Sequence, residues 1–357
     1  MLQPTTSEML DNCTLNDLID PTLGQALAHS VTGLDAPRAS AVALSAGPDS
    51  AVLAVHAAHW ARQHGQSLYF FHIHHGLQAS ADGWSRQALA LGRLLGVPTW
   101  VKKVQVKPTG DGIESAARRA RYQALQEMAS TLQVDTLFLG HHLDDQAETV
   151  LMRLLRGSGP TGMQAMRPRT HLGELLLLRP FLQVPRARIL QSAQQFGQHT
   201  HWHPVTDPTN LNPVYQRGVI REELTPVLTH HWPQWQRILG RHAQLAAEQS
   251  ALLDEWAAEL LARLDFDEGQ QRFDLLKWRA LTPAKQRLVL RYFFQQADLP
   301  MPSQARLAEM QRQLQTVHQL GTDRQLQIQH AQHVLRCTEG QVLLQPYDGP
   351  HKNKGKP

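Results

Sequence analysis

Short apolar runs alternate with segments of helical period along residues 39–200. Five runs have the length and β-rich composition of buried strands, namely 40–44, 67–73, 99–104, 135–139 and 174–178. The segments between them repeat apolar residues every three to four positions, as a helix does when it packs one face on a core. Strands that alternate with helices in this way predict an α/β fold built on a doubly wound parallel sheet.

The pattern changes near residue 240. Periodic helices are expected at 243–264, 285–294 and 304–314, and a run of short strands at 323–347. These elements predict a smaller C-terminal α+β domain. The chain then divides into a leader at 1–38, the sheet domain at 39–225, a linker helix at 226–240, the α+β domain at 241–346 and a basic, disordered tail at 347–357.

The composition is that of a soluble globular protein, with 42% hydrophobic and 18% charged residues in a chain of 357. No apolar stretch is long enough to span a membrane, and the acidic N-terminus lacks the features of a signal peptide. The only cysteines are Cys13 and Cys337, which excludes a thiolate zinc site or an iron–sulfur cluster. We therefore expect a cytoplasmic protein without a membrane partner.

The charge balance is basic. The net charge is +4, the isoelectric point is about 9.2, and 20 histidines can add positive charge beside an anion. This excess is compatible with a nucleic-acid partner, although many basic proteins bind none.

The stretch ALSAGPDSAVL at 43–53 interrupts apolar sequence with small and polar residues. It joins the first expected strand to a helix, and the free N–H groups and dipole of a helix start favour an anion. Small residues let a phosphate approach that backbone closely. An ordinary βα loop uses the same residue types, so the stretch alone leaves both interpretations open. The candidate phosphate ligands are Ser45, Ala46, Gly47, Pro48, Asp49 and Ser50.

Two further polar stretches follow later strands of the predicted sheet. HHGLQASAD at 74–82 follows the second strand, and GHHLDDQAET at 140–149 follows the fourth. Doubly wound sheets bind ligands at the carboxyl ends of their strands, so the three stretches should meet there. Acids are common in a first helical turn, yet two histidines with Asp144, Asp145 and Glu148 exceed what capping requires. Paired carboxylates that face a phosphate-binding turn suit a Mg²⁺–nucleotide site.

The helix expected at 113–129 carries Arg118 and Arg121 on one face, because the two are three residues apart. Two guanidinium groups on one face can hold phosphate oxygens. Solvent exposure is the simpler interpretation of such a pair, and the pair alone does not decide between the two.

With these stretches in order, the chain resembles the tRNA(Ile)-lysidine synthetases of the PP-loop ATP pyrophosphatase superfamily. The resemblance covers residues 39–230 and extends more weakly over the C-terminal domain. The matching segments are SAGPDS (45–50), HHGLQASAD (74–82), ESAARRARY (114–122), GHHLDDQAETVLMRLLRGSGPTGM (140–163), LRPFL (178–182), DPTN (207–210) and RGVIREEL (217–224). The first motif is shared with NAD, GMP and asparagine synthetases, whereas GHHxDDQAET followed by RGxGxxGM is far more specific.

The resemblance implies a ligase that joins free lysine to carbon 2 of the wobble cytidine of an isoleucine tRNA with a CAU anticodon. ATP, with Mg²⁺, would adenylate the carbonyl oxygen at carbon 2 and release pyrophosphate, and the ε-amine of lysine would then displace AMP. The C-terminal domain would bind the tRNA, and a homodimer is compatible with the resemblance.

The resemblance also implies roles for individual residues. Asp49 and Asp145 would hold Mg²⁺, and the catalytic residues would be Asp49, Arg118, Arg121 and Asp145. ATP would be bound by Ser45, Ala46, Gly47, Pro48, Asp49, Ser50, His74, Gly140 and His141. The tRNA or its flipped-out base would contact His75, His142, Asp144 and Arg217.

Three positions depart from the family pattern. Ala46 replaces the second residue of SGG, Gly218 replaces an asparagine, and Thr209 replaces a serine. Alanine is harmless at position 46 unless the backbone needs a positive φ, which would cost about 1 kcal/mol.

Three alternative functions fit the sequence less well. A 2-thiocytidine synthetase of the same superfamily needs clustered cysteines, which Cys13 and Cys337 do not supply. An NAD synthetase or similar small-molecule enzyme would not need a basic helical C-terminal domain. A tRNA-binding protein without activity would not need Asp49, Arg118, Asp144 or Asp145.

Overall fold

The computed structural model describes residues 9–76, 81–106, 113–206, 216–317 and 326–347. The chain forms two compact units, Met1–Ala247 and Glu248–Pro357. Beyond Tyr347, the tail predicted as basic and disordered lies outside the described residues, as does the DPTN segment.

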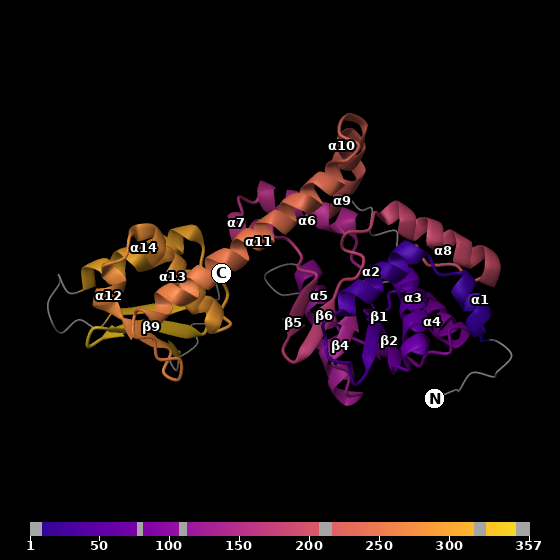
Figure 1. Cartoon of the computed structure of the whole chain (residues 1–357), viewed down its shortest axis with the longest axis horizontal. Helices are drawn as coiled ribbons and strands as arrows, with labels where there is room; N and C mark the ends of the chain where they lie inside the picture. Colours follow the sequence, from indigo (N-terminus) through magenta and orange to yellow (C-terminus); the bar gives the residue numbers. More distant parts are fainter. Residues whose placement is uncertain (1–8, 77–80, 107–112, 207–215, 318–325, 348–357) are drawn as a thin grey trace, which may run out of the picture. The chain divides into compact units, whose positions relative to one another are not determined.

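The first unit is built on a six-stranded sheet with the order β3-β2-β1-β4-β6-β5 (Figure 1). Its strands are β1 (Ser40–Ala43), β2 (Leu68–His74), β3 (Thr99–Lys103), β4 (Thr136–Phe138), β5 (Arg169–Leu172) and β6 (Leu175–Leu178). Five strands pair in parallel, at the positions predicted from the apolar runs, and β5 alone runs antiparallel, to β6. The predicted α/β class is confirmed, with an antiparallel edge strand added.

Helices pack on both faces of this sheet. The side chain of Val42 belongs to one core with α3 (Pro48–His64), whereas Ala41 belongs to another with α5 (Ile113–Thr131). Successive residues of a strand point to opposite faces, so the two cores lie on opposite sides of the sheet. The other helices after α3 are α4 (Ala81–Leu94), α6 (Leu143–Leu155), α7 (Pro160–Met163), α8 (Arg186–Thr200), α9 (Gln216–Val219) and α10 (Thr225–His231).

The N-terminal segment contributes to the same unit. Two helices, α1 (Asn12–Asp17) and α2 (Pro21–Val31), bury Leu15, Leu23 and Leu27 in the core that contains α3. The predicted leader with one short helix is therefore, over these residues, part of the folded core. The prediction missed this because its apolar residues are sparse between polar ones.

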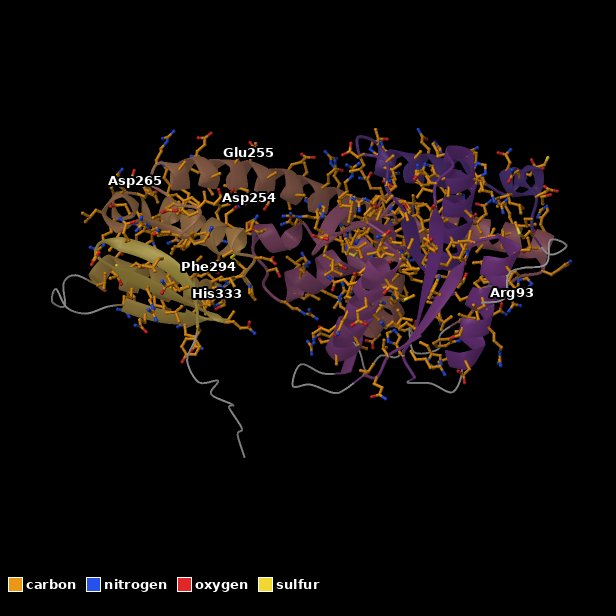
Figure 2. All side chains as sticks on the ribbon, turned by 90° about the horizontal axis from the view of Figure 1, so that it is seen from below. Arg93, Asp254, Glu255, Asp265, Phe294 and His333 are labelled. Carbon is orange, nitrogen blue, oxygen red and sulfur yellow. The ribbon has the colours of Figure 1, made fainter. Side chains whose placement is uncertain are left out.

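The second unit holds an antiparallel sheet with the order β7-β10-β9-β8. Its strands are β7 (Arg272–Asp274), β8 (Leu326–His330), β9 (His333–Thr338) and β10 (Gln341–Pro346), and its helices are α12 (Leu275–Arg279), α13 (Pro283–Gln296) and α14 (Gln304–Thr316). Phe294 of α13, labelled in Figure 2, is buried in the core of this unit. The predicted small α+β domain is confirmed. Helix α11 (Trp235–Ala262) contributes residues to both units.

No helix among the described residues is long and apolar enough to cross a membrane.

Candidate active site

The turn between β1 and α3 is held by its own hydroxyl groups. The Ser45 and Ser50 hydroxyls lie 2.9 Å apart, and the backbone N–H of Ser45 donates to Oγ of Ser50 at 3.1 Å. Gly47 is the N-cap of α3 and offers no side-chain cap, while Pro48 opens the helix. Because glycine has no side chain, Gly47 does not cap the first-turn N–H groups of α3. Uncapped N–H groups at a helix start suit an anion.

Ala46 adopts a left-handed backbone conformation, with φ of 65°. This is the position where the family pattern has glycine, and the positive φ costs an alanine about 1 kcal/mol. The side chain is fully buried, and the carbonyl of Ala46 accepts from the N–H of Val205 at 2.9 Å. The turn is therefore strained but fixed by packing and by a hydrogen bond from a distant segment.

Gly140 lets the end of β4 approach the start of α3. A Cβ at this position would meet the carbonyl oxygen of Asp49 at 3.1 Å and the Cα of Ser50 at 3.2 Å. Because both are backbone atoms, they cannot turn aside as a flexible side chain could. A larger residue here would force this backbone to move by a few tenths of an ångström, so the close approach favours glycine and brings two of the predicted motifs together.

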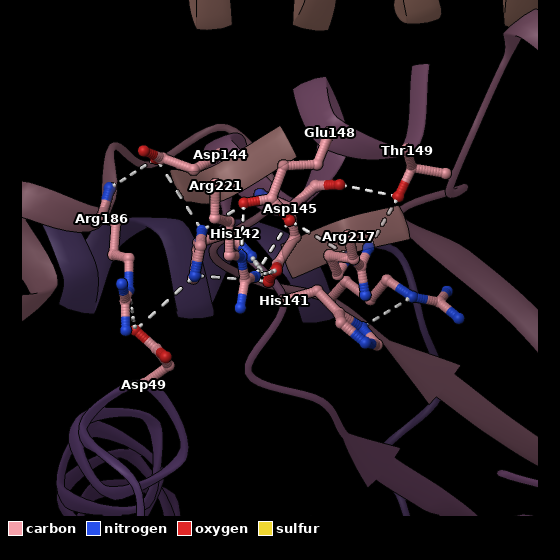
Figure 3. A network of polar contacts seen from close by, with 11 residues as sticks. Asp49, His141, His142, Asp144, Asp145, Glu148, Thr149, Arg186, Arg217 and Arg221 are labelled. Carbon is pink, nitrogen blue, oxygen red and sulfur yellow. Dashed lines mark hydrogen bonds and ion pairs between the residues drawn. The ribbon is translucent and has the colours of Figure 1, made fainter. Parts of the chain in front are cut away.

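His142 joins the two carboxylates predicted to act together. It is the N-cap of α6 and forms a capping box with Asp145, whose backbone N–H donates to Nδ1 at 3.3 Å. Its Nε2 lies 3.3 Å from Oδ2 of Asp145 and 3.7 Å from Oδ1 of Asp49. Asp49 and Asp145, from two strand ends, therefore approach the same buried imidazole, as Figure 3 shows.

Two arginines anchor the acidic face of α6 (Figure 3). Arg221 lies 3.0 Å from Asp145 and 2.7 Å from Glu148, and Arg217 lies 3.1 Å from Glu148. Arg221 sits in a π-helical segment, η2 (Ile220–Leu224), a form that is frequent at functional sites. The sequence pattern predicted Glu148 in the first turn of α6 together with the two aspartates, but the structure places it in the second turn, because the helix begins at Leu143.

The charges around Asp145 keep its carboxyl ionised. Burial raises the pKa of Asp145, but the neighbouring His142 and the guanidinium groups of Arg217 and Arg221 outweigh burial and lower it below its usual range. The side chain is 12% exposed. Asp145 is therefore a fixed anion at the edge of the site.

Arg186 reaches both neighbouring acidic groups. Its Nε lies 3.5 Å from Oδ1 of Asp49, and its backbone N–H donates to Oδ2 of Asp144 at 2.9 Å. Asp144 thus caps the start of α8 in addition to lying in the first turn of α6.

His141 is held by an arginine that the sequence motifs did not assign. Nε of Arg179 donates to Nδ1 of His141 at 3.2 Å, which leaves the imidazole proton on Nε2. Burial lowers the pKa of His141 to about 3, and the charges of Arg179, Arg121 and Arg118 contribute. His141 is consequently a neutral ring at physiological pH.

The two arginines of α5 lie near this group. Arg118 and Arg121 stack over the ring of Tyr122 at 5.0 and 5.4 Å. Burial lowers the pKa of both Arg121 and His75, and the charge of Arg121 also acts on His75. Arg121 is thus close to the end of β2 as well as to His141.

At the end of β2, His74 has a structural partner. Its Nε2 lies 3.0 Å from Oδ1 of Asp82, in the first turn of α4. The Nδ1 atoms of His74 and His75 are buried without a hydrogen-bond partner in the part of the chain that the structure describes. Metal ligation is not indicated here, since no group of three or more His, Cys, Asp or Glu among the described residues could hold an ion by itself.

The structure thus gathers the predicted residues of all four motifs at the carboxyl edge of the sheet. It adds three arginines, Arg179, Arg186 and Arg221, whose roles the sequence did not reveal. Arg179 and Arg221 lie within two of the quoted motifs, LRPFL and RGVIREEL, so the motifs did mark these segments as functional. Their partners come from distant segments, which spacing along the chain cannot show.

Comparisons with known proteins agree over most of the chain. Residues 19–228 match the family model of the PP-loop domain, and residues 273–343 match that of the TilS substrate binding domain. A protein of Bordetella bronchiseptica, the tRNA(Ile)-lysidine synthase, is 46% identical over 347 residues, which cover 95% of this chain and 99% of the relative. The tRNA(Ile)-lysidine synthase of Alkalilimnicola ehrlichii is 39% identical over 331 residues, covering 91% and 71% respectively.

Among solved structures, the U34-tRNA thiolase NcsA of Methanococcus maripaludis, with its 4Fe-4S cluster, aligns with a TM-score of 0.51. The alignment covers 69% of this chain and 88% of the thiolase at 17% identity. At that identity the likeness supports the fold alone.

Proposed function

The chain belongs to the tRNA(Ile)-lysidine synthase family, and we propose that it joins free lysine to carbon 2 of the wobble cytidine of an isoleucine tRNA with a CAU anticodon. The reaction uses ATP and gives lysidine, AMP and pyrophosphate. A thiolase reaction is not favoured, because Cys13 is exposed and Cys337 is buried in the second unit, far along the chain.

One observation carries the proposal. Asp49 from the β1–α3 turn and Asp145 from the start of α6 approach the same imidazole, with arginines beside each carboxylate. Activation of a carbonyl by ATP needs a phosphate-binding turn, paired carboxylates and cationic groups at one edge. These are the groups that the site contains.

The chemistry proceeds in two displacements. The O2 oxygen of cytidine attacks the α-phosphorus of ATP, a phosphorus–oxygen bond forms, and pyrophosphate leaves. The ε-amine of lysine then attacks carbon 2, loses its proton, and AMP leaves with the former carbonyl oxygen. The first step is required because the carbonyl oxygen of cytidine is a poor leaving group until it is adenylated.

The residues divide this work between them. The turn formed by Ser45 to Ser50 holds the phosphates, with the first-turn N–H groups of Asp49 and Ser50 as donors, and Arg118 and Arg121 stabilise charge on the transferring phosphate. We expect His74, Gly140 and His141 to contact ATP, and His75, His142, Asp144 and Arg217 to contact the base or the tRNA. His142 is 2% exposed and caps α6, so only the edge of its imidazole ring is available for such a contact.

Mg²⁺ fits this donor set. The ion takes one or two carboxylates together with phosphate oxygens, and Asp49 and Asp145 are the two carboxylates that the fold brings together. When bound, the ion would neutralise charge on the phosphates. Asp145 also forms an ion pair with Arg221 at 3.0 Å, so Asp49 is the more available of the two carboxylates for binding the ion.

The partners follow from the same proposal. The second unit, which contains the match to the substrate-binding family model, is the candidate for a further tRNA contact. We propose free lysine as the second substrate and the cytoplasm as the location. A measurement of the molar mass in solution tests whether the protein forms a homodimer.

The half-reactions test the proposed function. With α-labelled ATP, Mg²⁺ and isoleucine tRNA but no lysine, we expect label on the tRNA and release of pyrophosphate. Addition of lysine should then release labelled AMP. Pyrophosphate release that does not depend on tRNA, or AMP release without lysine, would contradict the order of steps.

Two variants with a matched control test the site. Asp49→Asn should abolish adenylation and leave tRNA affinity within a few fold. Arg118→Ala should slow adenylation by roughly ten- to a thousandfold. Arg119→Ala, one position on and about 100° around the helix, is the control and should have a much smaller effect. Equal losses for the two arginines would mean that the helix presents a different face.

A further inference from the structure

The turn between α10 and α11 exposes a large aromatic side chain. Trp232 is the C-cap of α10 and is 58% exposed, whereas Trp235, three residues on, is buried and donates from Nε1 to Oγ1 of Thr229 at 3.1 Å. Val227 and Ile238 are also exposed, at 54% and 49%. The fold thus uses one tryptophan of this turn for its core and leaves the other in solvent.

The same segment is free of acidic residues. Between residues 224 and 247 the chain has no Asp or Glu, although it begins directly after Glu223 and ends directly before Glu248. The acids of α11 lie in the second unit, among them Asp254 and Glu255, labelled in Figure 2. The exposed basic or titratable side chains of the segment are His230, His231, Arg237, Arg241 and His242.

Two arginines of this segment lie on the exposed surface of α11. Arg237 and Arg241 are four residues apart, hence on one face of α11, and neither forms an ion pair with any residue that the structure describes. Elsewhere in this unit, Arg186, Arg217 and Arg221 each face a carboxylate. The charge of this surface is thus left for a partner.

The opposite side of the segment is anchored to the site. Leu239 and Ala243 of α11 pack against Val150 of α6 and Ala165. A helical run from Gln216 to His231 also connects Arg221 directly to this turn. Trp232 follows Arg221 by eleven residues, which corresponds to about 16 Å along a helix. A single strand of a few nucleotides covers such a distance.

We propose that the surface formed by His231, Trp232, Arg237 and Arg241 binds the substrate RNA beside the modified nucleotide. One unpaired base stacks on the Trp232 ring, and the two arginines contact the flanking phosphates. This inference rests on the proposed function, because it takes the RNA to be the one modified at the site. It gives the segment first interpreted as a linker helix a role in binding.

Charge favours RNA over a second copy of the chain as the occupant. A two-fold symmetric contact would place each surface against itself and bring like charges together. RNA supplies the opposite charge, and its unpaired bases supply flat faces for an exposed indole.

Three substitutions of Trp232 separate stacking from general apolar contact. The probe is a fluorescent hairpin with the sequence of the anticodon arm of isoleucine tRNA, and its Kd is measured with full-length protein. Trp232→Leu and Trp232→Ala should weaken binding roughly 5- to 100-fold, because stacking on an aromatic ring is lost. Trp232→Phe should retain most of the wild-type affinity, because it keeps an aromatic ring. Wild-type affinity for Trp232→Leu, or for all three variants, would overturn the proposal.

The arginines are tested by salt dependence. Arg237→Gln and Arg241→Gln should each reduce the slope of log Kd against log salt by about 0.7 to 0.9. Arg93→Gln is the control, since Arg93 is an exposed arginine in the last turn of α4 and should leave the slope unchanged. Slopes that change equally in all three would overturn the assignment of this surface.

Two further readouts keep the outcomes distinct. Binding of ATP should be the same in every variant, which excludes misfolding as the cause of weaker RNA binding. A molar mass that falls to half in Trp232→Ala would instead identify a contact between copies and overturn the RNA assignment. Failure of wild-type protein to form lysidine would refute the proposed function, yet the hairpin affinities would still report on this surface.

Discussion

Arg221 and Glu148 form a bidentate ion pair: Nε lies 2.7 Å from Oε1, and Nη2 lies 2.9 Å from Oε2. The Glu148 side chain is 6% exposed, so the pair is largely removed from water. Nη2 of Arg221 also lies 3.0 Å from Asp145. A buried structural pair therefore positions one of the two carboxylates on which the proposed reaction depends.

Loss of this pair should destabilise the protein strongly. In Arg221→Met, the buried Glu148 carboxylate retains only Arg217 as an ion-pair partner among the described residues. We expect the free energy of unfolding to fall by about 3–5 kcal/mol, as measured by urea denaturation. The double variant Arg221→Met with Glu148→Met should recover much of that loss.

An exposed pair provides the comparison. Arg312 contacts Glu309 at 2.6 Å, but its side chain is 65% exposed. Arg312→Met should change stability much less than Arg221→Met, because solvent screens surface pairs. Similar losses in the two variants would mean that burial of the Glu148 pair does not set its strength.

Gly140→Ala should damage ATP binding more than folding. The new Cβ would press on the backbone of Asp49 and Ser50 and displace it by a few tenths of an ångström. A misplacement of about 1 Å can cost about 100-fold in activity, so we expect a smaller loss than that. Steady-state kinetics should show an increased KM for ATP or a lower kcat, with a small change in melting temperature. Gly83→Ala in α4 is the control, since its nearest atom lies 3.9 Å away at the end of Arg86. Unchanged kinetics in Gly140→Ala would contradict the close approach.

Arg179 should fix the tautomer of His141. Ring ¹⁵N shifts of labelled protein, assigned with a His141→Asn variant, should show a protonated Nε2 and an unprotonated Nδ1 at neutral pH. Arg179→Met should yield a mixture of tautomers and a raised pKa, since a hydrogen bond and a positive charge are lost. Thr170→Val is the matched control, because it removes another partner of Arg179 and spares His141. A tautomer unaffected by Arg179→Met would refute this role.

Stability should fall as the pH drops below about 6.5. Burial lowers the pKa of His56 to about 4 and that of His141 to about 3, from a usual value of 6.5. Between pH 6.5 and about 4, these histidines bind protons in the unfolded chain but not in the folded chain. The free energy of unfolding therefore increases with pH over this range. Urea midpoints across this range measure the slope, and His56→Gln should reduce it by about one proton. A protein that becomes more stable on acidification would contradict these assignments.

The sequence predicted the parallel strands because strands buried on both faces have continuous apolar runs, such as Leu175–Leu178. It missed β5, whose residues Arg169–Leu172 form a half-exposed edge with no such run. The site residues lie in motifs that directly follow strands, so their convergence could be predicted. The pairing of Arg179 with His141 could not, because it depends on how β6 packs beside β4.

Transfer of labelled lysine to tRNA tests the central claim most directly. The protein is incubated with ATP, Mg²⁺, ¹⁴C-lysine and isoleucine tRNA with a CAU anticodon, and in parallel with methionine tRNA of the same anticodon. The account predicts label in the isoleucine tRNA only, recovered after nuclease digestion in a modified wobble cytidine and equal in amount to the AMP released. Absence of label from the isoleucine tRNA, or label at another nucleotide, would contradict it.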